Sequence, residues 1–117
     1  GLSDERALRL MGVAKDWGMQ ALVEAHTPGE VDRAIGIGAD IVGVNARDLV
    51  TFELDPTLFG AMVPRFPEGV LRVAESAVAV SQDVTRYREQ GAHAVLVGEA
   101  LVTGANPRQR VEEFVAA

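Results

Sequence analysis

Helix-like and strand-like segments alternate four times along the chain, and this alternation limits the fold more than any other feature of the sequence. A leading segment, residues 4–17, carries apolar side chains at helical spacing. Mainly apolar, strand-like stretches follow at residues 19–25, 40–45, 70–75 and 94–97, each with a helix-like segment after it. Strands that alternate with helices form right-handed βαβ units and a parallel sheet. Two architectures satisfy this pattern: an open doubly wound sheet, or part of a (β/α)8 barrel.

Local signals mark where the helices begin and end. Thr27-Pro28-Gly29-Glu30 is a capping box, which predicts a helix that runs to about Ile37 and stops at Gly38. Further helices are predicted after the Asp55-Pro56 cap, over residues 81–90 before Gly91, and after the Asn106-Pro107 cap.

A similar tripeptide before two of the predicted strands favours the barrel over the open sheet. Gly38-Ala39-Asp40 and Gly91-Ala92-His93 precede two of the predicted strands, which indicates one supersecondary unit used more than once. The prediction is therefore an α/β fold in a single domain over residues 1–117. It is the parallel-sheet half of a TIM (β/α)8 barrel, with four βα units after a leading helix.

The composition excludes several classes of partner and chemistry. The net charge is −6 and the 11 Lys and Arg residues are scattered, so neither nucleic acid nor an anionic membrane surface is expected as a partner. No apolar run is long enough to cross a membrane, and the absence of cysteine removes thiolate catalysis and Cys-based zinc sites. No secretory signal pattern is present, so a cytoplasmic location is expected. A small anionic ligand stays compatible, because one helix N-terminus and one arginine can bind a phosphate.

The functional site is expected at the carboxyl ends of the strands, where parallel α/β folds bind their ligands. Each predicted strand ends there in a polar residue or a glycine. These tips are Glu24, Asn45, Glu75-Ser76 and Gly98-Glu99. Arg47 follows the second strand closely enough for its guanidinium group to reach an anion.

Side chains two positions apart share one face of a strand, which gives three pairs near the tips: Leu22 with Glu24, Gly43 with Asn45, and Ala74 with Ser76. If these faces point into a barrel, Glu24, Asn45 and Ser76 converge on its mouth. The inner face of the half barrel would then carry Leu22, Gly43, Ala74 and Leu96, turned partly to solvent. Because monomers rarely expose apolar patches beyond a few hundred Å², we expect a dimer, a larger species or a rearranged sheet.

Each candidate also has a structural interpretation when it is taken alone. Glu24 would be a salt-bridge partner, Asn45 a turn residue, Arg47 a solvated charge, Ser76 a helix cap and Gly98 a turn residue. His26 and His93 are expected to be structural or solvated, and Trp17 to pack on the buried face of its helix. The polar ending of all four strands together favours a site.

Four segments carry a family likeness: ALVEAHT, GADIVGVNARDLVTFELD, VLRVAES and GAHAVLVGEAL. Together, in this order and spacing, they resemble the C-terminal half of indole-3-glycerol phosphate synthase, an enzyme of tryptophan biosynthesis. The likeness extends over essentially the whole chain, which is similar to strands five to eight of that (β/α)8 barrel. The block GVNARDL is specific to this likeness rather than a general barrel pattern.

The resemblance implies a lyase reaction, the decarboxylative ring closure of a carboxyphenylamino-deoxyribulose phosphate, which needs no metal and no organic cofactor. It implies active-site positions at Glu24, Asn45, Glu75 and Ser76. It further implies phosphate-binding positions at Arg47, at the backbone of Ala77, and at Gly98 and Glu99. Glu24 would then act as general base, while Asn45 and Ser76 would orient the substrate and Arg47 would bind its phosphate.

The chain departs from the family in two respects. Ala77 stands where the family has glycine, and a methyl group costs roughly 1 kcal/mol or more if the backbone takes a positive φ. The other departure is that the first half of the barrel, which supplies the family's catalytic lysines and another glutamate, has no counterpart among these residues. Lys15 is the only lysine and falls in the leading helix, so it cannot replace them.

Two alternatives stay open at this point. The chain could be another phosphate-binding barrel enzyme, although the GVNARDL block weighs against this. It could also be a catalytically inactive half-barrel module, structural or for assembly. The partners expected are a phosphorylated small molecule and either the missing N-terminal half barrel or a second copy of the chain, because open strand edges need a cover.

Overall fold

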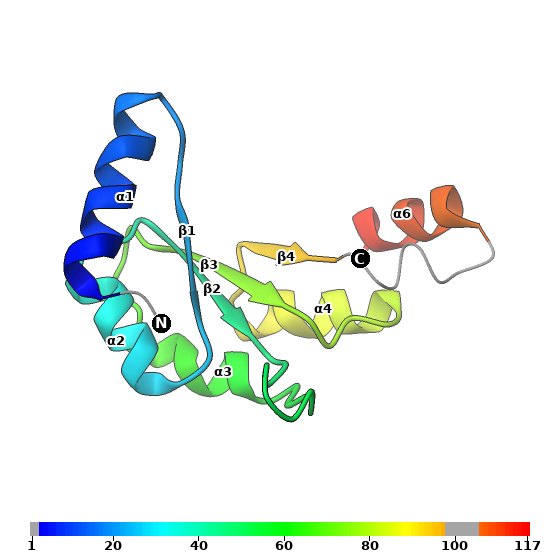
Figure 1. The fold of residues 1–117 in the computed structure, drawn as a ribbon. Coiled ribbons are helices and arrows are strands. Elements are labelled where there is room, and N and C mark those ends of the chain that lie inside the picture. Colours follow the sequence, from blue (N-terminus) through cyan, green and yellow to red (C-terminus); the bar gives the residue numbers. More distant parts are fainter. Residues whose placement is uncertain (1–2, 98–105) are drawn as a thin grey trace.

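The computed structural model describes residues 3–97 and 106–117 of the 117-residue chain. A four-stranded sheet lies at its centre (Figure 1), with the strands in the order β1-β2-β3-β4 and every neighbouring pair parallel. The strands are β1 (Leu22–Ala25), β2 (Ile41–Asn45), β3 (Leu71–Glu75) and β4 (Ala94–Leu96). The sheet contains no switch in strand order, which confirms the predicted half barrel over an open doubly wound sheet.

Helices precede and connect the strands. They are α1 (Asp4–Asp16), α2 (Pro28–Gly36), α3 (Leu58–Met62), which continues into the 3-10 turn η1 (Val63–Arg65), α4 (Ser81–Gln90) and α6 (Pro107–Val115). The predicted caps hold at α2 and α6, where Thr27 accepts from the Glu30 N–H and Asn106 from the Gln109 N–H. Gly91 ends α4 with φ 109°, a left-handed conformation that favours glycine. No helix of the described residues is long and apolar enough to cross a membrane.

Two boundaries differ from the sequence prediction by more than one residue. The first strand begins at Leu22 rather than at residue 19, and Met19 is exposed. The third helix begins at Leu58, because Asp55 caps a turn ahead of it instead of the helix itself. Its Oδ1 accepts both the N–H and the hydroxyl of Thr57.

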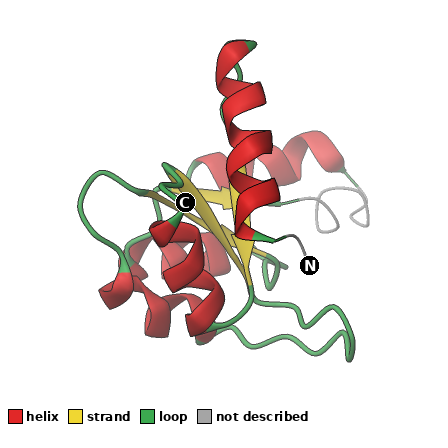
Figure 2. Ribbon diagram, turned by 60° about the vertical axis from the view of Figure 1, so that its left-hand side comes forward, coloured by secondary structure: helices red, strands yellow, loops and turns green. Residues whose placement is uncertain are grey.

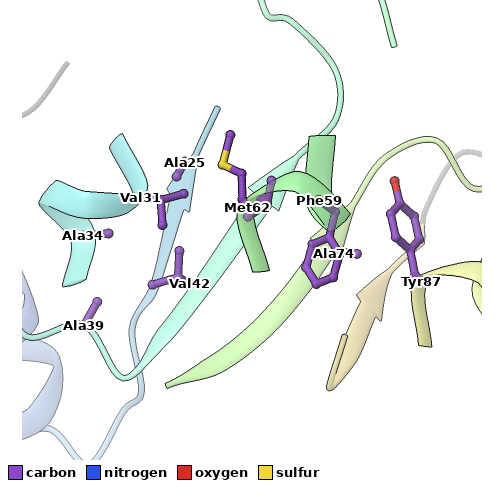
Figure 3. Close-up of a cluster of buried hydrophobic side chains, with 10 residues drawn as sticks. Ala25, Val31, Ala34, Ala39, Val42, Phe59, Met62, Ala74 and Tyr87 are labelled. Atoms are coloured by element: carbon purple, nitrogen blue, oxygen red, sulfur yellow. The ribbon is translucent and has the colours of Figure 1, made fainter. Parts of the chain in front are cut away.

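One face of the sheet is covered by α2, α3 and α4, which run along the same side of it (Figure 1). Figure 3 shows the apolar side chains between these layers. The buried cluster is Ala25, Val31, Ala34, Ala39, Val42, Val44, Phe59, Met62, Ala74 and Tyr87. Within it, the rings of Phe59 and Tyr87 pack edge to face at 5.6 Å between centroids. The core therefore lies on the helix side of the sheet.

The opposite face of the sheet carries the side chains that point toward the inside of a barrel. In the parallel register Leu22, Ile41 and Leu71 are neighbours near one end, and Asn45, Glu75 and Leu96 near the other. Leu22 is 43% exposed and Leu96 55% exposed. The apolar part of this face is therefore uncovered in the isolated chain.

The prediction of which β3 side chains point toward the inside of the barrel was wrong. Ala74 lies opposite Val44 and is fully buried in the core on the helix side, so it is not an inner-face residue. Val73 and Glu75 take that place instead, beside Gly43 and Asn45. The inner face of β3 thus contributes a carboxylate at its tip.

Helix α1 stands upright, with one end projecting beyond the rest of the molecule (Figure 2). It contains no buried residue. Trp17 at its C-terminus is 79% exposed, so the prediction that this side chain packs on a buried face was wrong. A salt bridge of 2.7 Å from Arg33 to Asp4 joins α2 to α1.

Candidate active site

Asn45 is the centre of a hydrogen-bonded group at the carboxyl end of the sheet. Its Nδ2 donates to Glu24 Oε1 at 2.9 Å, and its Oδ1 accepts from Ser76 Oγ at 2.6 Å. The same Oδ1 accepts from the backbone N–H of Arg47 at 3.0 Å. Asn45 is only 9% exposed, so these bonds fix both ends of its amide. The tips of β1, β2 and β3 are thereby joined through one side chain.

Ser76 reaches Asn45 because the backbone leaves the strand conformation at this point. Ser76 has φ 67° and Ala77 has φ 57°, both left-handed. Strand alternation alone would place the Ser76 side chain with Ala74, toward the helices. The carbonyl oxygen of Ser76 is held by the hydroxyl of buried Tyr87 at 3.1 Å. The core thus anchors a backbone turn that aims a hydroxyl into the site.

Glu75 is nearly buried beside this group. It is 5% exposed, it lies opposite Asn45 in the register, and its Oε2 has no hydrogen-bond partner among the described residues. Burial and the neighbouring Glu24 carboxylate raise the pKa of Glu75 to about 7, although the nearby His26 imidazole lowers it in part. With this pKa, Glu75 is present in both its protonated and its ionised form near neutral pH.

The Glu75 carboxylate occupies the space beside Gly43 that a side chain at position 43 would fill. A Cβ atom at Gly43 would overlap Glu75 Oε2 and would lie 2.9 Å from Glu75 Cδ. No side chain other than hydrogen fits at this position without moving the carboxylate. Sequence reasoning placed Gly43 on the inner face but missed this role, for which the only signal was a glycine inside an otherwise β-branched strand.

His26 lies closer to the site than its sequence context indicated. Its Nε2 is 3.1 Å from Glu24 Oε1, and its Nδ1 is 3.5 Å from Glu30 Oε1 at the start of α2. The sequence signal was its spacing, two positions beyond Glu24 and four before Glu30. His93, by contrast, accepts the backbone N–H of Arg72 at the other end of the sheet and takes no part in the group.

Arg47 begins the loop after β2, and its guanidinium group bonds within that loop. Its Nη1 donates to the carbonyl oxygen of Phe52 at 2.9 Å, and its backbone pairs with Leu54 in an isolated bridge. Asp48 holds the tip of the same loop, because its carboxylate accepts the N–H groups of Val50 and Thr51. These two bonds lower the pKa of Asp48.

The structure brings Glu24, Asn45, Glu75 and Ser76 together. Of the residues expected to bind phosphate, Arg47 and Ala77 lie at the same end of the sheet, at the starts of the loops after β2 and β3. Gly98 and Glu99 lie outside the described residues. No group of His, Asp and Glu among the described residues has the arrangement of a metal site.

Comparison with known proteins identifies the family of the chain. The sequence profile of the indole-3-glycerol phosphate synthase family matches residues 1–114. The chain belongs to the indole-3-glycerol phosphate synthase family. Its relatives include the indole-3-glycerol phosphate synthases of Leifsonia xyli subsp. xyli, 54% identical over 97% of this chain, and of Mycobacteroides abscessus, 47% identical over 99%.

The chain spans 43% of the length of both of these indole-3-glycerol phosphate synthases. Solved structures with lower sequence identity share its fold. The native KDPGal structure matches 99% of this chain and 54% of its own, with a TM-score of 0.72 and 18% identity. The N-acetylmannosamine-6-phosphate 2-epimerase of Clostridium perfringens matches 94% of this chain and 48% of its own, with a TM-score of 0.69 and 16% identity. These two matches bear on the fold alone.

Proposed function

We propose that this chain supplies the C-terminal half of the active site of an indole-3-glycerol phosphate synthase in tryptophan biosynthesis. The reaction is the decarboxylative ring closure of a carboxyphenylamino-deoxyribulose phosphate. The observation that carries the proposal is the Glu24–Asn45–Ser76 hydrogen-bonded group with Glu75 beside it, at the end of the sheet where barrel enzymes bind their substrates.

Glu24 is the general base of this proposal. Its Oε1 accepts one hydrogen bond from Asn45, which holds the carboxylate at the strand tip, where it would take a proton from the substrate. Glu75 has a pKa of about 7, so near neutral pH it can hold or release a proton beside Glu24. A carboxylate beside a carboxyl group whose pKa is raised toward neutral pH suits a ring closure that ends in proton removal and dehydration.

Asn45 and Ser76 position the substrate. Their polar atoms are fixed by bonds to each other, to Glu24 and to the Arg47 backbone, so they are preorganised before any ligand arrives. The substrate phosphate is assigned to Arg47, to the backbone after Ser76, and to Gly98 and Glu99. Two consecutive left-handed residues, Ser76 and Ala77, support this assignment because such turns present backbone N–H groups to an anion.

The family's acid on the substrate ketone is a lysine, and this chain has no lysine at a strand tip. Lys15 is the only lysine of the sequence, and it lies in the last turn of α1, remote from the strand tips. The proposal therefore requires an N-terminal half barrel, on the same polypeptide or on a separate one. The exposed inner face, with Leu22, Leu71 and Leu96 each more than 40% accessible, is the surface that such a half would cover.

That exposed face also favours a second candidate function, a catalytically inactive half barrel that assembles with another copy.

One experiment distinguishes the enzyme half from the assembly module. The chain is assayed for indole-3-glycerol phosphate formation alone, and again after refolding with the N-terminal half of the Leifsonia xyli relative as a separate polypeptide. Turnover only in the mixture supports the enzyme proposal. A folded, associated mixture without turnover, together with a stable homodimer of the chain alone, supports the assembly module.

A further inference from the structure

Two side chains of α4 hold successive carbonyl oxygens of the loop after β3. The hydroxyl of Tyr87 donates to the carbonyl oxygen of Ser76 at 3.1 Å. Nη2 of Arg86 donates to the carbonyl oxygen of Ala77, the next residue along the loop, at 3.4 Å. The ring of Tyr87 is buried, and the guanidinium group of Arg86 lies over it at 4.9 Å from the ring centroid. Both carbonyl oxygens are therefore held toward α4.

These two bonds fix the direction of the N–H groups that follow. Both peptide bonds are trans, so the C=O of one residue and the N–H of the next lie in one plane and point in opposite directions. The N–H of Ala77 therefore points away from Tyr87, and the N–H of Val78 points away from Arg86. Neither N–H group has an acceptor among the described residues. The loop thus turns two successive donors away from the helix.

Asp83, in the first turn of α4, occupies the next N–H groups of the loop. Its Oδ2 accepts the N–H of Ala79 at 2.9 Å and that of Val80 at 3.1 Å. Its Oδ1 accepts from Arg86 Nη1 at 2.9 Å, which holds the guanidinium group beside the loop. The N–H groups of the two residues before Ala79 are therefore the pair that this segment leaves for a ligand.

From this geometry we infer that Arg86 and Tyr87 are positioning residues for the proposed phosphate site. They hold two carbonyl oxygens toward α4, so that the N–H groups of Ala77 and Val78 together face a phosphate oxygen. The inference rests on the function proposed above, because it assigns the residues that hold the loop proposed to bind phosphate. Alanine at φ 57° is strained, and the Arg86 bond helps to hold it there. Both α4 residues act through the backbone rather than by contact with the phosphate.

The test measures the binding of inorganic phosphate to the ¹⁵N-labelled 117-residue chain, followed in ¹H–¹⁵N NMR spectra at constant pH and ionic strength. The amide signals of Ala77 and Val78 should shift with one common Kd. Tyr87→Phe removes the hydroxyl without a change of charge, and Arg86→Gln removes the guanidinium group. Each substitution should raise the Kd for phosphate by about threefold or more, because each releases one carbonyl oxygen of the loop.

Arg88→Gln is the matched control. Arg88 lies on the same helix and also donates to a backbone carbonyl oxygen, but to that of Ala117 at the end of the chain. Its replacement should leave the Kd for phosphate unchanged. An unchanged Kd for Tyr87→Phe or for Arg86→Gln, in a variant with the dispersed spectrum of a folded chain, would overturn the inference.

Asp83→Asn separates positioning from the charge of Arg86, and it is the second route if either α4 variant above does not fold. Loss of a negative charge beside the loop would by itself lower the Kd for phosphate. Asparagine has a single acceptor oxygen, so it cannot replace both the oxygen that binds the loop and the oxygen that binds Arg86. The inference therefore predicts a Kd raised by about twofold or more. A lower or unchanged Kd would overturn it, because Arg86 would then act by charge alone.

These measurements need no turnover. The expected changes in Kd, together with an inactive reconstituted barrel, would overturn the proposed reaction and leave the roles of Arg86 and Tyr87 intact. The absence of phosphate-induced shifts at Ala77 and Val78 in the natural chain would overturn the inference, whereas turnover by the reconstituted barrel would still support the proposed function.

Discussion

Ser76 Oγ and Asn45 Oδ1 lie 2.6 Å apart, although 31 positions separate the two residues in the chain. The bond joins the tip of β3 to the tip of β2, and the second end of the same amide continues to Glu24 on β1. Asn45 can serve both neighbours only because its side chain has an acceptor at one end and a donor at the other. A leucine or an aspartate of similar size would lose one or both of these bonds.

Replacing Asn45 should therefore destabilise the fold as well as disrupt the site. Asn45→Ala is expected to lower the free energy of unfolding by about 1–3 kcal/mol, because it leaves Ser76 Oγ and the Arg47 N–H without their acceptor in a nearly buried position. Urea unfolding followed by circular dichroism measures this. Ser76→Ala should cost less, and the double variant should cost less than the sum of the two. Additive costs would show that the two side chains do not interact in solution.

The pKa of Glu75 gives the stability a pH dependence of known sign. The pKa is about 7 in the folded chain against an ordinary value of 4.5, so the folded state binds the proton more tightly than the unfolded state. This contribution is fully present below about pH 4.5 and is lost as the pH rises through about 7. The loss should approach about 3 kcal/mol, from roughly 1.4 kcal/mol per pKa unit.

Glu75→Gln removes this dependence. We expect the free energy of unfolding of the natural chain to fall relative to that of the variant between pH 4.5 and pH 8. The lowered pKa values of Asp48, Asp55 and Asp83 act at more acidic pH and in the opposite direction, so they do not mask the effect. Parallel pH profiles for the two proteins would mean that Glu75 is ionised and solvated.

A methyl group at Gly43 should displace the Glu75 carboxylate. Gly43→Ala is expected to destabilise the chain by about 1–3 kcal/mol, because the new Cβ would overlap Glu75 Oε2. Gly12→Ala is the matched control, since Gly12 lies within α1 with no atom near its added Cβ. It should stabilise the chain by up to about 1 kcal/mol. In a Glu75→Ala background the cost of Gly43→Ala should largely disappear, and an unchanged cost would contradict this reading of the contact.

Ala77 carries backbone strain that glycine would release. Its φ is 57°, a conformation that costs an alanine roughly 1 kcal/mol or more. Ala77→Gly should therefore raise the free energy of unfolding by up to about 1 kcal/mol, measured by urea unfolding. Ala7→Gly, within α1, should lower it by a similar amount. Destabilisation by both substitutions would show that the left-handed backbone at Ala77 is not populated in solution.

Much of the fold could be predicted because its signals are local. The Thr27 capping box, the Gly91 stop and the Asn106 cap each act within a few residues, and four such units specify parallel βαβ connections. The inner face of β3 could not be predicted from alternation. Two left-handed residues after the strand turn Ser76 back into the site, and their conformation depends on the Tyr87 bond from α4.

The contacts that shape the site join different helices and strands, and this explains why part of it was missed. The space for Glu75 depends on Gly43 in a neighbouring strand, and the position of His26 depends on Glu30 in the next helix. Both positions follow from contacts between elements rather than from the place of a residue at a strand end. The prediction that Arg47 binds phosphate stays a prediction, and its guanidinium group donates to the Phe52 carbonyl of its own loop.

The most direct measurement compares two variants of the chain in the barrel reconstituted with the N-terminal half of the Leifsonia xyli relative. Glu24→Gln removes the proposed general base, and Glu89→Gln removes an exposed carboxylate of α4. Glu24→Gln should lower kcat for indole-3-glycerol phosphate formation by on the order of 10²–10⁴, while Glu89→Gln should leave it unchanged. If Glu24→Gln turns over as fast as Glu89→Gln, with both mixtures folded and associated, then the strand-tip carboxylate is not the base and the proposed function of this site is wrong.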